Sequence, residues 1–447
     1  MLPHLDYTAF YGGANMSFTV TEIRQNLFSV FSSLLERRDE FLKNPASDFT
    51  RKKKISFEQT MLFPMIAGAD NIATELLDLF GEEDFPLPSA MIQRRNQIKK
   101  EAFKELFYLF NKSIPIEKTF HGYQLIACDG TRLNLPYNPN DSNTFVDHIE
   151  GRKGFNQIHM NALYDVMNDL FLDVELQGMH EMNERDAFCK LLGKYSKADP
   201  KTIFIADRGY ASYNVYAHAI NNNQTFLIRI KESDAKRLCP DNKHLLDSSC
   251  VDENVTIHVG RRRKNTNCKY ENYHFIRKGH CYDFIDYGTN KVDALSLRIL
   301  KFPLPTGMFE YIVTNLSNDL FSLGTIKELY NLRWNEETAF RHLKYAGNMV
   351  HIHSVKSDFL LQEIYGKLTL YNFSSCITKV ITKRKNVNTT YTYNFNHAQM
   401  QKFVRLYVIG VVKDLVKLMN RFLVPVRPGR KFKRIIRRQS AVPLSYR

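Results

Sequence analysis

The stretch "KTIFIADRGY", residues 201–210, decides the fold. Its apolar residues form a short unbroken run that ends at an aspartate, with Arg-Gly directly after it. Such a run is typical of a strand that is buried on both faces, as in a parallel sheet. The sequence on either side must then supply neighbouring strands and the helices that cover them.

The flanking sequence alternates between strand and helix patterns. Before the stretch, three β-rich runs and one helical run are predicted, at 123–135, 156–167, 170–178 and 183–195. After it, residues 213–222 predict a helix and residues 224–231 a strand. Three strands, helix, strand, helix, strand predicts a mixed α/β sheet with the order of an RNase H-like core.

The alternation stops at residue 232 and resumes near 309. The segments between are polar, turn-rich and strand-like, and structureless loops of this length are uncommon, so a β-rich insertion is predicted. We therefore expect five parts: a helical DNA-binding region at 1–120, the first part of the catalytic core at 121–231, the insertion at 232–308, the second part of the core at 309–380, and a basic helical C-terminal region at 381–447.

The N-terminal region contains two helical segments joined by the turn "GEEDFPLP", residues 81–88. With Ser89 as N-cap of the second helix, the pair is similar to a helix-turn-helix that reads DNA, and Arg94 and Arg95 would contact the DNA. An ordinary helical hairpin with a basic solvated face explains the pattern equally well. Both interpretations stay open at this point.

Composition favours a polyanionic partner. The chain of 447 residues has 62 Lys+Arg against 47 Asp+Glu, a net charge of +15, which favours nucleic acid, although a merely basic soluble protein fits as well. Its seven cysteines include no C-x-x-C pair, so neither a zinc ribbon nor a disulfide framework is expected. No signal peptide or membrane-length apolar segment is predicted. We expect a cytoplasmic protein associated with the DNA of the cell.

The helix predicted after the last strand contains "YNLRWNEETAFRHLK", residues 330–344. A capping box of Thr325 and Glu328 would begin it and Gly347 would end it. At 3.6 residues per turn, four polar residues fall within an arc of about 60°, beside the apolar face and not opposite to it: Tyr330, Arg333, Glu337 and Lys344. A polar stripe at this border suits the wall of a cleft.

Glu337 needs partners if it is to bind a metal ion, and two aspartates are candidates. Asp129 and Asp207 each end an apolar strand, the first and fourth of the predicted order, which lie side by side in that fold. A lone aspartate at a strand end is more often a turn former. Three converging carboxylates, however, repel one another unless they hold cations, about two in phosphoryl-transfer enzymes.

The neighbouring side chains suit binding of phosphate. Arg333 can donate two N–H groups, Lys344 a point charge and Tyr330 a hydroxyl. Arg208 either contacts phosphate or forms a salt bridge within its turn. For Trp334 we favour core packing over base stacking, and for His159 a buried structural role over an approach to the carboxylates.

These motifs carry a family resemblance. Y-x2-R-x3-E-x6-K, with "DGTRL" at Asp129 and "ADRGY" at Asp207, resembles the signature of bacterial insertion-sequence transposases of the IS-four group, in the DDE superfamily. The resemblance covers about residues 55–375. It implies a DNA transposase that cleaves insertion-sequence ends with divalent metal and transfers strands into target DNA by a cut-and-paste route.

The resemblance also implies the roles and the partners. Asp129, Asp207 and Glu337 would hold two Mg²⁺ ions, with Mn²⁺ as a substitute, while Tyr330, Arg333 and Lys344 hold the DNA. The partners would be double-stranded terminal repeats and target DNA, bridged by a homodimer in a synaptic complex. Family members often form a DNA hairpin with the help of an aromatic residue, which would be Phe309 or Tyr311 here.

Two alternatives remain. One is a catalytically inactive, transposase-derived DNA-binding protein, although an inactive protein has no physical need for three mutually repelling carboxylates. The other is an RNase H-like nuclease without strand transfer, which would share the metal site but would not need the Tyr-Arg-Lys stripe.

Overall fold

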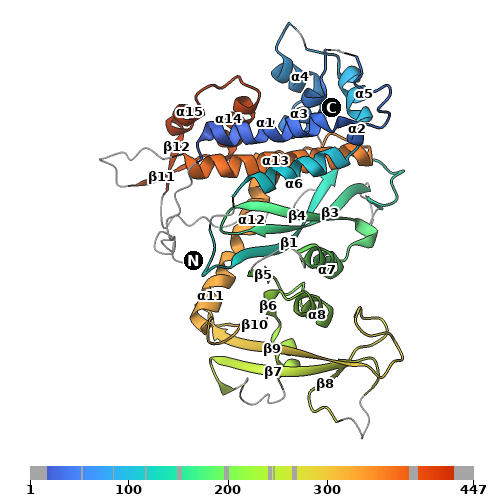
Figure 1. Cartoon of the computed structure of the whole chain (residues 1–447). Coiled ribbons are helices and arrows are strands. Elements are labelled where there is room, and N and C mark those ends of the chain that lie inside the picture. The colour runs from blue at the N-terminus through green and yellow to red at the C-terminus, as the bar shows by residue number, and fades with distance from the viewer. Residues whose placement is uncertain are drawn as a thin grey trace.

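The computed structural model describes most of the chain and shows a mixed α/β structure (Figure 1). The described residues are 18–51, 54–83, 85–115, 118–147, 154–195, 201–239, 244, 247–263, 269–381 and 391–426. A large sheet forms the centre. A set of long helices covers its upper part in the view of Figure 1, and shorter helices flank it.

The central sheet has ten strands in the order β2-β3-β1-β5-β6-β10-β9-β7-β8, with β4 paired to β3. Their bounds are β1 (Gln124–Leu135), β2 (Phe145–Val146), β3 (Phe155–Asp165), β4 (Leu170–Gly178), β5 (Thr202–Ala206), β6 (Thr225–Ile230), β7 (Val251–Gly260), β8 (Tyr273–Phe275), β9 (Val292–Pro303) and β10 (Phe309–Thr314).

The strands of the core match the predicted ones. β1 is antiparallel to β3 and parallel to β5, and β5 is parallel to β6. The predicted adjacency of the two aspartate-bearing strands is therefore confirmed. β5 is buried along nearly its whole length, because strands on both sides and helices on both faces surround it.

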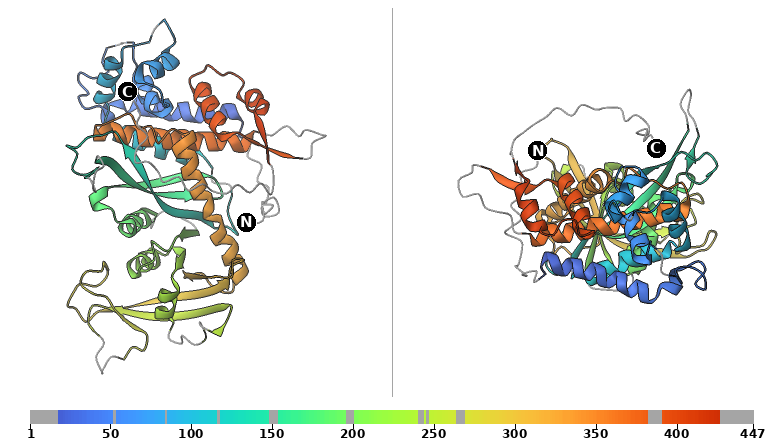
Figure 2. Two further views of the ribbon diagram at one scale, coloured as in Figure 1. Left: turned by 180° about the vertical axis from the view of Figure 1, so that it is seen from behind. Right: turned by 90° about the horizontal axis from the view of Figure 1, so that it is seen from above.

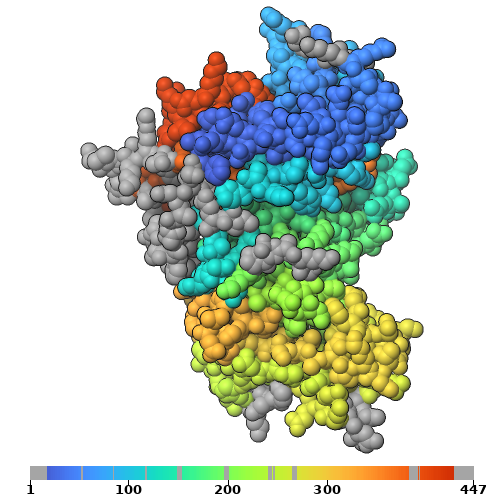
Figure 3. Space-filling view, viewed as in Figure 1, coloured from blue at the N-terminus to red at the C-terminus, as the bar shows by residue number. Residues whose placement is uncertain are grey.

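The strands between residues 232 and 308 extend this same sheet. β10 pairs with β6 on one side and with β9 on the other, both antiparallel, and β9 pairs with β7. Arg298 of β9 is 1% exposed and pairs with Asp252 of β7 through two contacts of 2.7 Å. The predicted β character is confirmed, and these strands lie at the end of the molecule opposite to the N-terminal helices (Figure 3).

The helices begin and end as follows: α1 (Val20–Glu36), α2 (Arg38–Phe41), α3 (Phe57–Ile66), α4 (Ile72–Phe80), α5 (Pro88–Gln97), α6 (Glu101–Ser113), α7 (Glu184–Tyr195), α8 (Tyr213–Asn221), α9 (Glu232–Leu238), α11 (Leu323–Leu332), α12 (Trp334–Arg341), α13 (Ser357–Val380), α14 (His397–Val408) and α15 (Leu415–Arg421). Leu87 is the N-cap of α5 and Pro88 its first residue, so Ser89 is not the cap.

The long helix α13 joins the N-terminal helices to the sheet. It packs against α1, α3 and α6 on one side and β4 on the other, and most of its residues are buried (Figure 2). A Cβ on Gly366 would lie 3.0 Å from the backbone nitrogen of Met65 in α3. Glycine therefore permits the close approach of these two helices.

The helix with the polar stripe differs from the prediction. Its N-cap is Ser322, whose hydroxyl accepts from the Thr325 N–H at 3.2 Å, so the Thr325–Glu328 capping box is wrong. α11 and α12 are separated at Arg333, and a π-helical turn, His342–Ala346, follows α12. The predicted end at Gly347 is confirmed. Because of these two irregularities, the uniform helical spacing does not extend to Lys344.

The described C-terminal part contains more than helices. α14 and α15 are present, and a two-stranded sheet pairs β11 (Thr392–Phe395) with β12 (Leu423–Val426). The basic segment "RPGRKFKRIIRR", residues 427–438, lies outside the described residues. Within the described ranges, no helix combines the length and the apolar character needed to cross a bilayer.

Candidate active site

Three elements bring the predicted carboxylates together. Cys128 of β1 pairs with Ala206 of β5 in parallel register, so Asp129 and Asp207 are the next residues along two adjacent strands. α12 packs against β1 and contains Glu337. β5 ends at Ala206, but β1 continues to Leu135, so Asp129 lies in the middle of its strand and not near its end as predicted. The two aspartates are close because Asp207 follows the end of β5 next to this part of β1.

The charges of Asp207, Glu337 and Arg333 act on the carboxyl group of Asp129. Burial raises the pKa of Asp129 to about 6, and the negative charges of Asp207 and Glu337 add to this effect. The Gly130 N–H, which donates to Asp129 Oδ1 at 2.8 Å, and the Arg333 guanidinium oppose it. Asp207 accepts from the Gly209 N–H at 2.6 Å. The three predicted carboxylates thus share one electrostatic environment.

Arg333 lies between two of these carboxylates. Its Nη1 is 3.6 Å from Asp129 Oδ2, and its Nη2 donates to Glu337 Oε1 at 3.0 Å. The side chain is only 5% exposed, and the guanidinium lies near the rings of Tyr330 and Trp334, 5.8 and 5.2 Å from their centroids. The guanidinium therefore neutralises charge that a metal ion would otherwise neutralise.

A divalent cation fits the chemistry of this donor set. In the part of the chain that the structure describes, no group of three or more His, Cys, Asp or Glu side chains is close enough to hold a metal ion. The donors are nevertheless the carboxylates that Mg²⁺ and Mn²⁺ prefer, and Arg333 stands in for a cation between Asp129 and Glu337. The metal set predicted from the sequence therefore fits by donor chemistry, with Arg333 as the counter-charge in this structure.

α12 contains a further carboxyl group, Glu336, directly before Glu337. Glu336 is 0% exposed, and neither of its carboxyl oxygens has a hydrogen-bond partner among the described residues. Burial raises its pKa well above the usual range, and the charge of Asp129 adds to the shift. Burial therefore favours the uncharged form of this carboxyl group, while the Arg333 guanidinium and the Asp129 N–H act in the opposite direction on its pKa.

The other stripe residues are more buried than a surface for DNA requires. Tyr330 is 3% exposed, and burial raises its pKa to about 12. Lys344 is half-buried, and burial lowers its pKa. Trp334, in contrast, is 51% exposed, so the prediction of core packing for this residue is wrong.

The three arginines predicted outside the stripe occupy different environments. Arg208 is exposed beside Asp207. Arg94 and Arg95 are 7% and 3% exposed, which corrects the prediction that they face DNA. Arg94 stacks on Phe49 at 4.4 Å, and Arg95 pairs with Glu363 of α13. Both guanidiniums are turned inward because α5 packs against the body of the protein through this face.

Sequence inspection missed Glu184, the first residue of α7. Its Oε1 lies 3.2 Å from Nε2 of His159, which is 3% exposed, as expected for a buried histidine. His159 Nδ1 lies 3.1 Å from Asn161 Nδ2. The only local signal was an acidic residue at the start of the helix that follows the third core strand.

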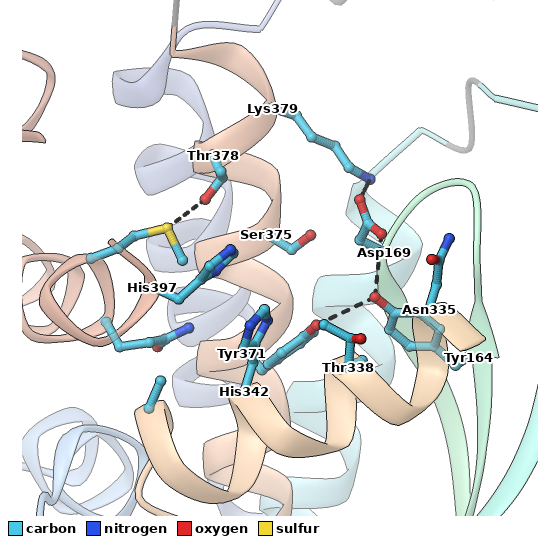
Figure 4. Close-up of a pocket in the computed structure, with 14 residues that line it drawn as sticks. Tyr164, Asp169, Asn335, Thr338, His342, Tyr371, Ser375, Thr378, Lys379 and His397 are labelled. Atoms are coloured by element: carbon cyan, nitrogen blue, oxygen red, sulfur yellow. Dashed lines mark hydrogen bonds and ion pairs between the residues drawn. The ribbon is translucent and has the colours of Figure 1, made fainter. Parts of the chain in front are cut away.

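A separate pocket of about 240 Å³ lies on another side of α12 (Figure 4). α12, the π-helical turn, α13 and α14 line it, and His342 stacks on His397 with ring centroids 3.9 Å apart. An ion pair of Lys379 and Asp169 closes one side. None of Asp129, Asp207 and Glu337 lines this pocket, so it is distinct from the carboxylate site.

The chain is similar to known transposases. The chain is 22% identical over 372 residues to the transposase for insertion sequence element IS1151 of Clostridium perfringens, with 73% of this chain and 75% of that protein covered. The cryo-EM structure of a piggyBac transposase synaptic complex with hairpin DNA has a TM-score of 0.44 and 10% identity, over 89% of this chain and 78% of that chain. The model of the transposase DDE domain family matches residues 120–373. Because this match covers more than half of its 447 residues, the chain belongs to the transposase DDE domain family.

Proposed function

We propose that this transposase cleaves DNA at the ends of an insertion sequence in a metal-dependent reaction and transfers the freed strands into target DNA by a cut-and-paste route. The observation that carries the proposal is that Arg333 contacts both Asp129 of β1 and Glu337 of α12, while the charge of Asp207, directly after β5, acts on Asp129. The strand order β4-β3-β1-β5-β6 supports an RNase H-like core of the IS-four type.

The proposed metal ligands are Asp129, Asp207 and Glu337. Two Mg²⁺ ions, or Mn²⁺ in their place, would lower the pKa of the attacking water and neutralise charge on the reacting phosphate. The residues of this chain hold that charge in place and exclude bulk water.

Arg333 is the proposed phosphate ligand of the stripe. Its guanidinium contacts Asp129 and Glu337. Once these carboxylates are neutralised, the guanidinium can donate two N–H groups to a DNA phosphate. The Tyr330 ring lies 5.8 Å from this guanidinium, and Lys344, in the π-helical turn that follows α12, is a further proposed DNA contact. Exposed Trp334 offers a ring on which a base can stack.

The DNA partner is double-stranded, with the terminal repeats and the target held in a synaptic homodimer. Arg208, exposed next to Asp207, is a proposed backbone contact. The helices of the N-terminal region supply further contacts through residues other than Arg94 and Arg95. For a hairpin step, Phe309 is the better aromatic candidate, since it is 40% exposed and Tyr311 is 7% exposed.

The test uses the purified full chain with DNA that carries the element's ends, in Mg²⁺ or Mn²⁺. We expect Asp129→Asn, Asp207→Asn and Glu337→Gln each to lower the cleavage rate by at least about 100-fold, because a metal ligand is lost. Asp39→Asn, whose side chain is 75% exposed, is the control and should cleave normally.

Three outcomes separate the alternatives. Unaltered cleavage by Asp129→Asn and Glu337→Gln would contradict the three-carboxylate site. Cleavage by the wild type without joining to target DNA would identify a nuclease. Specific binding to the ends without cleavage would identify a DNA-binding protein that has lost activity.

A further inference from the structure

Glu184 approaches the active-site edge from the opposite face of the sheet. Successive residues of a strand point to opposite faces, so Asp129 faces α12 while Gly130 faces α7. Glu184 begins α7 with its side chain 38% exposed. Glu184 is thus an accessible carboxylate on the α7 face of the sheet, opposite to the α12 face that contains Glu337.

Two glycines make room for this side chain. A Cβ on Gly130 would lie 3.0 Å from Glu184 Oε1 and 2.6 Å from a ring carbon of His159, so a larger residue would displace the pair. A Cβ on Gly209 would lie 3.4 Å from Glu184 Oε2 and also 3.4 Å from Asp207 Oδ1. The carboxylates of Glu184 and Asp207 therefore border the same small space, where β5 has ended.

Buried partners hold Glu184 in this position. Tyr210 donates to Asn161 Oδ1 at 3.0 Å, Asn161 contacts His159, and His159 contacts Glu184 Oε1. A metal-binding carboxylate commonly has such a supporting hydrogen bond behind it. The interaction with His159 occupies Oε1, and Oε2 is directed to the Gly209 side.

We propose that Glu184 is a fourth carboxylate of the metal site, which binds one of the two divalent cations together with Asp207. Asp129 and Glu337, on the α12 face, would bind the other cation. The inference rests on the proposed function, because it assumes that Asp129, Asp207 and Glu337 bind metal at all.

Trp334 provides a direct measurement of metal binding. It is the only tryptophan of the chain, and its ring lies 5.2 Å from the Arg333 guanidinium, which contacts Asp129 and Glu337. Mn²⁺ titrations of the DNA-free full chain would follow quenching of Trp334 fluorescence, and electron paramagnetic resonance of free Mn²⁺ would count the bound ions. Neither measurement depends on catalysis.

We expect the wild type to bind two Mn²⁺ ions. Glu184→Gln should retain one ion and bind the second at least about tenfold more weakly. The matched control is Asp186→Asn on the same helix, whose side chain is 44% exposed and pairs with Lys190; it should bind two ions with wild-type affinity. His159→Gln removes the supporting contact but leaves the carboxylate, so it should bind the second ion more weakly than the wild type and more tightly than Glu184→Gln.

The outcomes separate this inference from the proposed function. If the wild type binds no Mn²⁺, or Asp129→Asn binds two ions normally, the proposed function fails. If Asp129→Asn loses an ion while Glu184→Gln binds two with wild-type affinity, only the role of Glu184 is overturned.

A second measurement covers the case in which Glu184→Gln does not fold. Fe²⁺ with ascorbate cuts a protein backbone next to the bound iron, so it can be applied to the wild type. We expect cuts near residues 129, 207 and 337, and also near residue 184. Cuts at the first three positions without a cut at the start of α7 would overturn the assignment of Glu184.

Discussion

Glu336 is an unusual residue for the position before a proposed metal ligand. It is fully buried, and its carboxyl oxygens have no hydrogen-bond partner within the described ranges. Leaving a buried polar group unsatisfied costs about 1–3 kcal/mol. The side chain therefore destabilises the folded protein next to a proposed functional residue, where such local costs are common.

Replacing this carboxyl group should stabilise the protein. For Glu336→Leu we expect the free energy of unfolding at pH 7.5 to rise by about 1–3 kcal/mol, because an apolar side chain loses no hydrogen bonds on burial. Urea denaturation of the metal-free protein measures the change. Glu328→Leu, at an exposed position on α11, is the control and should change stability little. A less stable Glu336→Leu protein would show that the carboxyl has a stabilising partner.

At the scale of elements, the π-helical turn after α12 connects the active-site helix to the C-terminal region. It packs against α14, and the rings of His342 and His397 stack across the contact. Burial lowers the pKa of His342 to about 4, and the charges of His397 and Arg341 add to this effect. His342 is therefore neutral in the folded protein at physiological pH.

This contact should weaken in acid. Above pH 6.5, His342 is neutral in both the folded and the unfolded chain, so it does not make the free energy of unfolding depend on pH. As the pH falls from 6.5 to about 4, the unfolded chain takes up the proton before the folded one, so folding loses about 1–2 kcal/mol from this residue when solvent screening of the partly exposed ring is included. The difference in unfolding free energy between wild type and His342→Gln, measured against pH, should show this loss.

The control is Tyr345→Gln, at a 63% exposed position on the same turn. It changes no histidine, so its stability should follow the wild-type pH curve. Wild-type and His342→Gln curves that run parallel between pH 7 and 4 would contradict the shifted pKa.

At the scale of the whole molecule, a buried ion pair joins the N-terminal helices to the core. Arg95 of α5 contacts Glu363 of α13 at 3.4 Å, and their side chains are 4% and 1% exposed. Arg95 also donates to Gln362 Oε1 at 3.1 Å and to the Phe359 carbonyl at 3.2 Å. The contacts lock α5 to α13, so the proposed DNA-binding region and the catalytic core form one packed body.

Removing one partner should therefore be costly. For Arg95→Ala we expect a loss of about 3–5 kcal/mol in unfolding free energy, because Glu363 would remain as an uncompensated buried charge. The double variant Arg95→Met/Glu363→Gln should recover a large part of it. Arg38→Ala, at a 44% exposed position, should change stability by less than about 0.5 kcal/mol. If the Arg95→Ala protein is as stable as the wild type and binds DNA more weakly, the prediction that Arg95 contacts DNA is correct after all.

The sequence by itself determined the order of core strands and helices and the adjacency of Asp129 and Asp207. Local periodicity specifies the strands and helices, since apolar runs must be buried. The adjacency of the two aspartates followed from the RNase H-like order of these elements, in which the first and fourth strands are neighbours. Only the tertiary structure decided which charges meet. Arg95 and Glu363 are 268 positions apart, and Arg333 turns to carboxylates instead of facing solvent. Glu184 lies beside Asp207 because Gly130 and Gly209 leave room for its side chain and His159 contacts its carboxylate. Such contacts depend on packing between distant elements, which local patterns of polarity do not encode.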